Sequence, residues 1–202
     1  MLERSFHAAR RTLTAKILAT GFLAAGLGLV GCANVQPFVP DTAVMPAGAL
    51  GGGLDPDVTA ANLAYWAFAD SGRTYGRPIE AARAAASLDY LAGEIYTSPR
   101  WQNVDALTKE QLLQGRQQLR TALGVRPGIH SQAVVDTLTS AGNALAAGDQ
   151  AKAVGILNDG TFQEPGQQVL IRLSNLPYIQ MANVGTTHLA NELFQNDNEF
   201  LF

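Results

Sequence analysis

A histidine, a serine and an acid stand close together in the chain, and these three residue types can perform nucleophilic catalysis. His130 and Ser131 are adjacent, and Asp136 follows shortly after them. In a hydrolase such a histidine takes the serine proton while the acid orients the imidazole ring. A triad is assembled in three dimensions, however, and the sequence has no G-x-S-x-G nucleophile elbow. The simpler interpretation is that Ser131 or Gly128 caps a helix and that His130 lies in a loop.

A second histidine and an acid have the spacing of a metal-binding pair. His188 and Glu192 are four residues apart, which places both on one face of a helix. One histidine and one acid supply only half of a metal site, and no His-Glu-x-x-His run supplies the remaining ligands. We therefore expect a hydrogen-bonded histidine here, and we assign no metal, cofactor or catalytic residue from the sequence.

The N-terminal residues have the pattern of a secretory signal peptide. Residues 17–30 are apolar or small and carry no charge. This run is shorter than the roughly 20 residues that a membrane-spanning helix needs. The residues before it are basic, with a single acid, Glu3, against Arg4, Arg10, Arg11 and Lys16. A basic region followed by a short apolar run predicts export from the cytoplasm, with residues 1–31 as the signal peptide.

The end of this run, Leu29-Val30-Gly31-Cys32, resembles the lipobox of bacterial lipoproteins. The resemblance implies that the Cys32 thiol receives a diacylglyceryl group and that a lipoprotein signal peptidase cuts between Gly31 and Cys32. It also implies that a fatty acid such as palmitate is then attached to the freed amine. Two or three acyl chains hold a protein firmly on a membrane. The alternative is an ordinary cysteine beside an ordinary secretory cleavage site.

The two residues after the cysteine indicate which of the two membranes the protein would be anchored in. Ala33-Asn34 lacks the aspartate that retains many lipoproteins in the inner membrane. By resemblance to that sorting rule, we expect the periplasmic leaflet of the outer membrane.

Composition limits what the exported chain can do. Removal of residues 1–31 takes away four basic residues and one acid, which changes the formal charge of −3 to −6. No basic patch interleaved with aromatic residues indicates a nucleic-acid partner. Because Cys32 is the only cysteine, an intrachain disulfide is impossible.

Residues 32–54 read as the modified Cys32 and a flexible tether. Residues 33–54 contain three prolines, four glycines and a single charge, which is typical of a linker. We expect this stretch to be dispensable for folding. Three larger apolar residues within it could dock on the domain or lie at the membrane interface, namely Phe38, Val39 and Met45.

Residues 55–202 predict an all-α domain, a compact bundle of about six helices. Apolar residues recur with the helical period of 3.6, and no stretch shows the alternation of a strand. Asp55 before Pro56 is a helix start, Thr108-Lys-Glu-Gln111 has the form of a capping box, and Gly124 suits a helix end. The expected helices cover residues 55–71, 78–96, 108–124, 134–148, 149–160, 164–176 and the stretch from 178 onward.

One pair of these helices has a local resemblance to a known repeat. Residues 143–157, with a Gly-Asp turn, look like one hairpin of a tetratricopeptide repeat. No second copy follows at a period near 34 residues, so we interpret the stretch as a single pair of antiparallel helices.

Aromatic residues offer two further candidates for binding. One set has helical spacing and belongs either to the core or to a groove: Tyr65, Trp66, Phe68, Tyr75 and Trp101. The other is the C-terminal pair Phe200 and Phe202, which we expect to dock on this domain or on a partner.

Together these patterns favour a membrane-anchored envelope lipoprotein. We expect it to act as a binding or scaffold module for an envelope protein or a wall component. One alternative is a small periplasmic hydrolase that uses His130 or His188. The other is a carrier of an apolar ligand held between its helices.

Overall fold

All regular structure in the described part of the chain is helical. The structure is a computed structural model, and it describes residues 40–51 and 55–199. The expected all-α class is therefore confirmed for these residues. They form the helices α1 (Pro56–Phe68), α2 (Pro78–Thr97), α3 (Ala106–Leu123), α4 (Ser131–Ala146), α5 (Gln150–Ile156), α6 (Gly166–Ser174) and α7 (Gln180–Glu199), with the short 3₁₀ helices η1 (Ser71–Arg73) and η2 (Pro99–Trp101).

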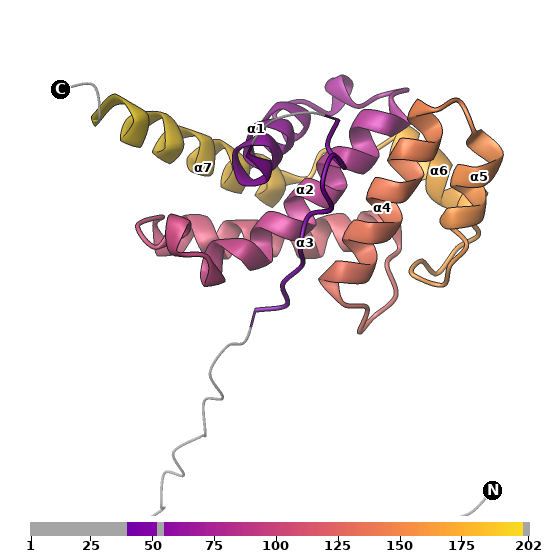
Figure 1. Ribbon diagram of the computed structural model, residues 1–202, viewed down its shortest axis with the longest axis horizontal. Helices are drawn as coiled ribbons and strands as arrows, with labels where there is room; N and C mark the ends of the chain where they lie inside the picture. Colours follow the sequence, from indigo (N-terminus) through magenta and orange to yellow (C-terminus); the bar gives the residue numbers. More distant parts are fainter. Residues whose placement is uncertain (1–39, 52–54, 200–202) are drawn as a thin grey trace, which may run out of the picture. The chain divides into compact units, whose positions relative to one another are not determined.

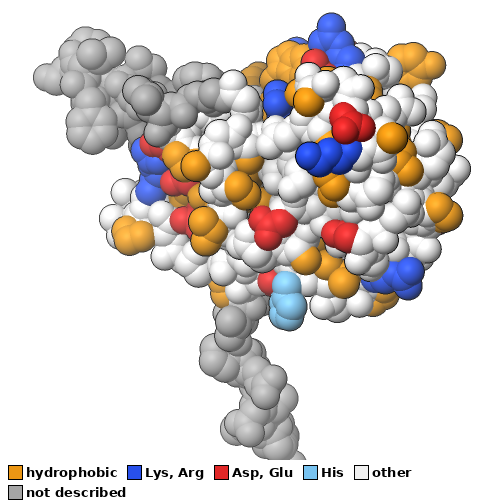
Figure 2. All heavy atoms as spheres, turned by 45° about the vertical axis from the view of Figure 1, so that its right-hand side comes forward, with side chains coloured by type: hydrophobic (Ala, Val, Ile, Leu, Met, Phe, Trp, Pro, Cys, Tyr) orange, Lys and Arg blue, Asp and Glu red, His pale blue; other side chains and the backbone are white. Residues whose placement is uncertain are grey.

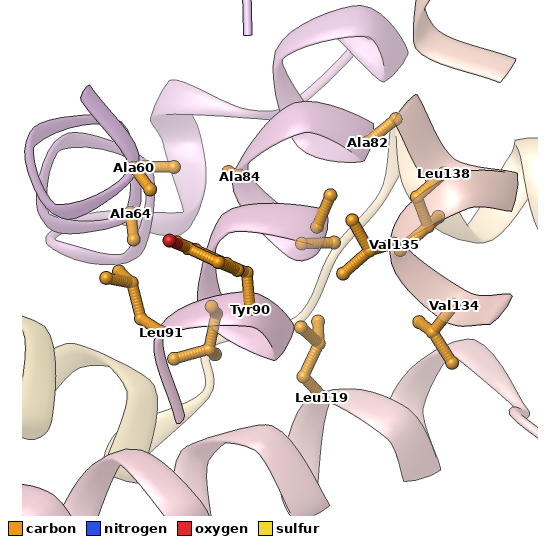
Figure 3. Packing of buried hydrophobic residues seen from close by; sticks show 14 of the residues in the cluster. Ala60, Ala64, Ala82, Ala84, Tyr90, Leu91, Leu119, Val134, Val135 and Leu138 are labelled. Atoms are coloured by element: carbon orange, nitrogen blue, oxygen red, sulfur yellow. The ribbon is translucent and has the colours of Figure 1, made fainter. Parts of the chain in front are cut away.

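Helix α2 lies in the middle of the bundle, with α1, α3 and α4 around it (Figure 1). The sequence predicts one apolar stripe on this helix, and the structure buries nearly every side of it. Six of the thirteen buried residues of α2 are alanines, whose small side chains let several helices approach it closely. Figure 3 shows side chains of α1, α3 and α4 packed around α2, among them Ala60, Leu119 and Val135.

Local capping residues set several helix boundaries as predicted. The Asp55 carboxylate accepts hydrogen bonds from the first two free backbone N–H groups of α1. Gly124 ends α3 with a positive φ of 73°, which glycine adopts without strain. The turn between α4 and α5 contains Gly148, also at positive φ, and Asp149 caps α5. The predicted pair of helices is therefore present.

The predicted capping box at the start of α3 is wrong. The helix begins at Ala106, because the side chain of Asp105 caps it by accepting from the Leu107 N–H. The Thr108 hydroxyl instead donates to Glu192 of α7 at 2.7 Å. A tertiary hydrogen bond therefore uses the residue that sequence reasoning assigned to a local cap.

Helices α3 and α7 pack closely because glycines lie at their contact. A Cβ atom on Gly115 would lie 2.8 Å from the backbone nitrogen of Ala182. A Cβ atom on Gly185 would lie 3.0 Å from the backbone nitrogen of Leu112. This close approach brings His188 and Glu192 of α7 beside the N-terminal half of α3.

The structure differs from the expected tether over residues 40–51, which we call the strap. Figure 1 shows the strap as the indigo segment that precedes α1. Three of its side chains are buried, Ala43, Met45 and Ala49, so Met45 docks on the domain. The strap also makes hydrogen bonds with α3 and α4. The proline and glycine content that suggested a linker thus accompanies a segment of irregular structure, with a turn at residues 47–50, that contacts the domain.

Several predictions fall outside the described residues. These include Gly31 and Cys32 of the lipobox, the apolar residues Phe38 and Val39, and the C-terminal Phe200 and Phe202. Within residues 40–51 and 55–199, no helix is both long and apolar enough to cross a membrane.

Candidate functional site

A buried ion pair lies where the strap meets the bundle. Asp89 of α2 is fully buried, and both of its carboxylate oxygens accept from Arg120 of α3 at 2.7 Å. Arg120 also donates to the Ile129 carbonyl and to the Ser131 hydroxyl at the start of α4. The ion pair therefore joins three helices at one point.

Asp41 of the strap completes this group of residues. Its carboxylate accepts from the backbone N–H of Ser131 at 2.9 Å and so caps α4 from 90 residues away. Its carbonyl oxygen accepts from Arg116 of α3 at 2.8 Å, and its carboxylate lies 3.5 Å from Arg120. We call these five residues the clasp: Asp41, Asp89, Arg116, Arg120 and Ser131.

The clasp shifts the pKa values of its members in opposite directions. Burial alone would raise the pKa of Asp41, but the hydrogen bonds from Ser131 and the charge of Arg120 outweigh it, and that pKa is lowered. Burial lowers the pKa of Arg116, the guanidinium with less direct carboxylate contact. Burial would also lower the pKa of Arg120, but Asp89 and Asp41 raise it. Asp41 and Arg120 are thus held in their charged forms.

The structure does not assemble His130, Ser131 and Asp136 into a triad. Ser131 is buried, and its hydroxyl accepts hydrogen bonds from the guanidinium groups of Arg116 and Arg120. The His130 side chain is 87% exposed and lies near Asp41, with Nδ1 3.4 Å from Oδ1. Asp136 accepts from Gln132 on the surface of α4. These contacts support a structural role for Ser131. The expected N-cap is wrong, however, because the N-cap of α4 is His130 and Ser131 is the first residue of the helix.

His188 and Glu192 share a helix face as predicted, but each makes a contact with α3. Glu192 accepts from the Thr108 hydroxyl and from the Asp105 backbone N–H at 3.0 Å. His188 Nδ1 lies 2.8 Å from the side-chain oxygen of Gln111. Among the described residues, no group of three or more histidine, cysteine or acidic side chains lies close enough to hold a metal ion. The pair therefore joins α7 to α3, as expected for a hydrogen-bonded histidine.

The five aromatic residues of the sequence analysis do not form one groove. Trp101 and Phe68 are buried in the core, whereas Tyr75 is 71% exposed. Tyr65 and Trp66 are half-buried on α1. Of these five residues, only Tyr75 therefore exposes enough of its side chain to contact a partner with most of its ring.

Three exposed apolar side chains, one of them Tyr75, lie on segments that meet near the end of α6. The Gly76 N–H donates to the Ser174 carbonyl at 2.8 Å, which fixes the loop of Tyr75 against α6. Ile171 precedes Ser174 by one helical turn, and Tyr178 follows it by four residues. Both Ile171 and Tyr178 are exposed. We call Tyr75, Ile171 and Tyr178 the apolar patch.

Three hollows in the described surface have charged side chains in their linings. One of about 650 Å³ lies between α4 and α5 and carries Asp136, Asp149 and Lys152. Another of about 510 Å³ lies between α3 and α7 beside Glu192. A third of about 460 Å³ lies at the C-terminal end of α3. On the face in Figure 2, acidic and basic side chains are interspersed with separate hydrophobic ones. All three are open to solvent, unlike the closed apolar cavity that a carrier of an apolar ligand would offer.

Comparisons with protein-family models, with curated proteins and with solved structures find no match for this chain. The functional argument therefore depends on its own residues and their geometry.

Proposed function

We propose that this protein is a lipid-anchored module of a bacterial cell envelope and that it binds another envelope protein or a wall component. The proposed anchor is Cys32 in the lipobox Leu29-Val30-Gly31-Cys32, after a signal peptide over residues 1–31. The proposed location is the periplasmic leaflet of the outer membrane.

The strap supports a position close to the membrane surface. Asp41 is bound to α3 and α4 through the clasp, and it follows Cys32 by nine residues. A fully extended chain spans at most about 3.3–3.6 Å per residue, so this link reaches about 30 Å. A lipid on Cys32 would therefore keep the bundle near the headgroups.

The apolar patch is the observation that carries the binding proposal. Large exposed apolar side chains that gather at one place mark interaction surfaces more often than isolated ones do. Tyrosine is enriched at protein–protein interfaces because its ring is apolar and its hydroxyl is polar. The patch therefore favours another envelope protein over a wall component as the partner.

The proposed anchor predicts that Cys32→Ser abolishes lipid attachment, because a hydroxyl does not replace the thiol in the first transfer. Cells fed a clickable fatty acid should label the wild-type protein and leave the variant unlabelled. Fractionation of the envelope on a sucrose gradient should place the wild type with outer-membrane markers. Label on the Cys32→Ser protein would refute the anchor, and co-migration with inner-membrane markers would refute the location.

The proposed surface predicts that Tyr75→Ser combined with Tyr178→Ser removes a crosslinked partner protein in intact cells. The matched control is Val44→Ser, which changes an equally exposed apolar side chain on the strap. The control should keep the partner, and both variants should melt like the wild type. An unchanged crosslinking pattern in the double variant would count against the patch.

A further inference from the structure

The hollow at the C-terminal end of α3 differs in charge from the acidic chain around it. It lies between the end of α3, residues 124–128, the loop before α6, and α6 itself. Its lining contains three arginines and one acid, Arg120, Arg126, Arg172 and Glu164. We call this hollow of about 460 Å³ the arginine pocket. Its volume lies within the range of about 300–1,000 Å³ that is typical of small-molecule sites.

Backbone contacts fix the walls of the arginine pocket. Val125 and Phe162 pair in antiparallel fashion, and the Gln163 N–H donates to the Gly124 carbonyl at 2.8 Å. Arg172 Nη1 reaches across from α6 and donates to the Ala122 carbonyl at 2.9 Å. Hydrogen bonds therefore hold in place the backbone segments that carry the charged side chains.

The three arginines are not equally available to a ligand. Asp89 neutralises Arg120, and Glu164 pairs with Arg172. Arg126 is exposed and donates through Nε to the Phe162 carbonyl at 2.8 Å. Its two terminal nitrogens have no hydrogen-bond partner within residues 40–51 and 55–199. Arg126 therefore presents the planar edge of a guanidinium that can bind a carboxylate or phosphate through two parallel hydrogen bonds.

Glu164 adds a complementary acceptor to the same pocket. Its Oε1 pairs with Arg172, and its side chain is 36% exposed, so this ion pair does not enclose the carboxylate. A carboxylate has about four lone-pair sites, so it can accept a further hydrogen bond from a donor group on a ligand. The pocket thus offers a donor edge at Arg126 and an acceptor at Glu164.

We propose that the arginine pocket binds a small molecule that carries a carboxylate or phosphate group together with a hydroxyl or amino donor. The anionic group pairs with Arg126, and the donor group binds the carboxylate of Glu164. This site is separate from the apolar patch and does not depend on it.

Isothermal titration of the purified protein with three probes tests the proposal. Inorganic phosphate carries the anion alone, glycerol 3-phosphate adds hydroxyl donors, and alanyl-alanine combines a carboxylate with an ammonium group. We expect glycerol 3-phosphate or alanyl-alanine to bind more tightly than inorganic phosphate. Tighter binding of one of these two identifies the natural anion as a phosphate or a carboxylate.

Variants assign the binding to the two residues. Arg126→Ala should weaken the better probe by about tenfold or more, and Arg126→Lys should only partly restore the affinity. Glu164→Gln should weaken the same probe without weakening inorganic phosphate, because it removes the negative charge that the ligand's donor group contacts and also releases Arg172 from its ion pair. Arg77→Ala, an exposed arginine outside the pocket lining, is the control and should bind like the wild type.

Three results would each overturn the proposal. One is that none of the probes binds at millimolar concentration. The second is that Arg126→Ala binds as well as Arg77→Ala does. The third is that inorganic phosphate binds as tightly as the better of the other two probes, since Glu164 would then have no part in recognition. Thermal melts of each variant confirm that a lost signal does not come from unfolding.

Discussion

Replacement of Asp89 by alanine is expected to lower the free energy of unfolding by about 3–5 kcal/mol, the usual cost of removing one partner from a buried ion pair. Asp89 has no exposed surface, and it accepts two hydrogen bonds from Arg120. In the variant, the guanidinium of Arg120 stays buried beside that of Arg116 with only Asp41 to offset both. The loss in the free energy of unfolding therefore measures the cost of leaving a buried positive charge in the clasp without its main partner.

Urea unfolding followed by circular dichroism measures this effect. Asp136→Ala removes an exposed acid from α4 and should change the stability by less than about 0.5 kcal/mol. The double variant Asp89→Leu with Arg120→Met should recover part of the loss, because apolar residues of similar size can replace a buried pair, while the Ile129 carbonyl and the Ser131 hydroxyl lose Arg120 as a donor. A loss below about 1 kcal/mol for Asp89→Ala would show that the pair is not needed to hold the three helices together.

The strap is expected to contribute the second large effect. A chain that begins at residue 52 should be less stable by about 3 kcal/mol or more than one that begins at residue 40. Burial of Met45 alone is worth roughly 1.5–3 kcal/mol, and the deletion also removes the carboxylate that caps α4. Equal melting temperatures for the two chains would restore the interpretation of residues 40–51 as a tether.

A single substitution tests the strap within the full chain. A Cβ atom on Gly93 of α2 would lie 2.4 Å from the Asp41 carbonyl oxygen, so Gly93→Ala must displace the strap. We expect a loss of about 1–3 kcal/mol from this overpacking. The control is Gly142→Ala in α4, where the nearest atom would be 3.6 Å away. Because alanine favours a helix more than glycine does, the control should be neutral or stabilising.

The helices could be predicted because their signals are local. The apolar period of α2, the Asp55-Pro56 start of α1 and the C-terminal glycine of α3 each lie within a few residues of the boundary that they set. Thr108 shows where this reasoning fails. Its capping box is a valid local pattern, but Asp105 and a hydrogen bond to Glu192 of α7 determine the actual arrangement.

The clasp and the docked strap could not be predicted because their partners are far apart in sequence. Asp41 resembles any other acid in a proline-rich linker, and its contact with Ser131 exists only in the folded chain. One signal was present at Asp89, a charged residue inside the alanine-rich apolar stretch of α2. An acid at such a position implies a buried cationic partner, although the sequence does not say which arginine supplies it.

The separation of Asp41 from Ser131 also sets an order for folding. Contacts between residues 90 positions apart require the whole intervening chain to be available before they form. The helices α1 to α3 lie within that interval and have shorter-range contacts with one another, whereas the contact of Asp41 with Ser131 can form only once residue 131 is in place. Under the proposed export from the N-terminus, Asp41 would thus emerge early and make its contact with Ser131 late.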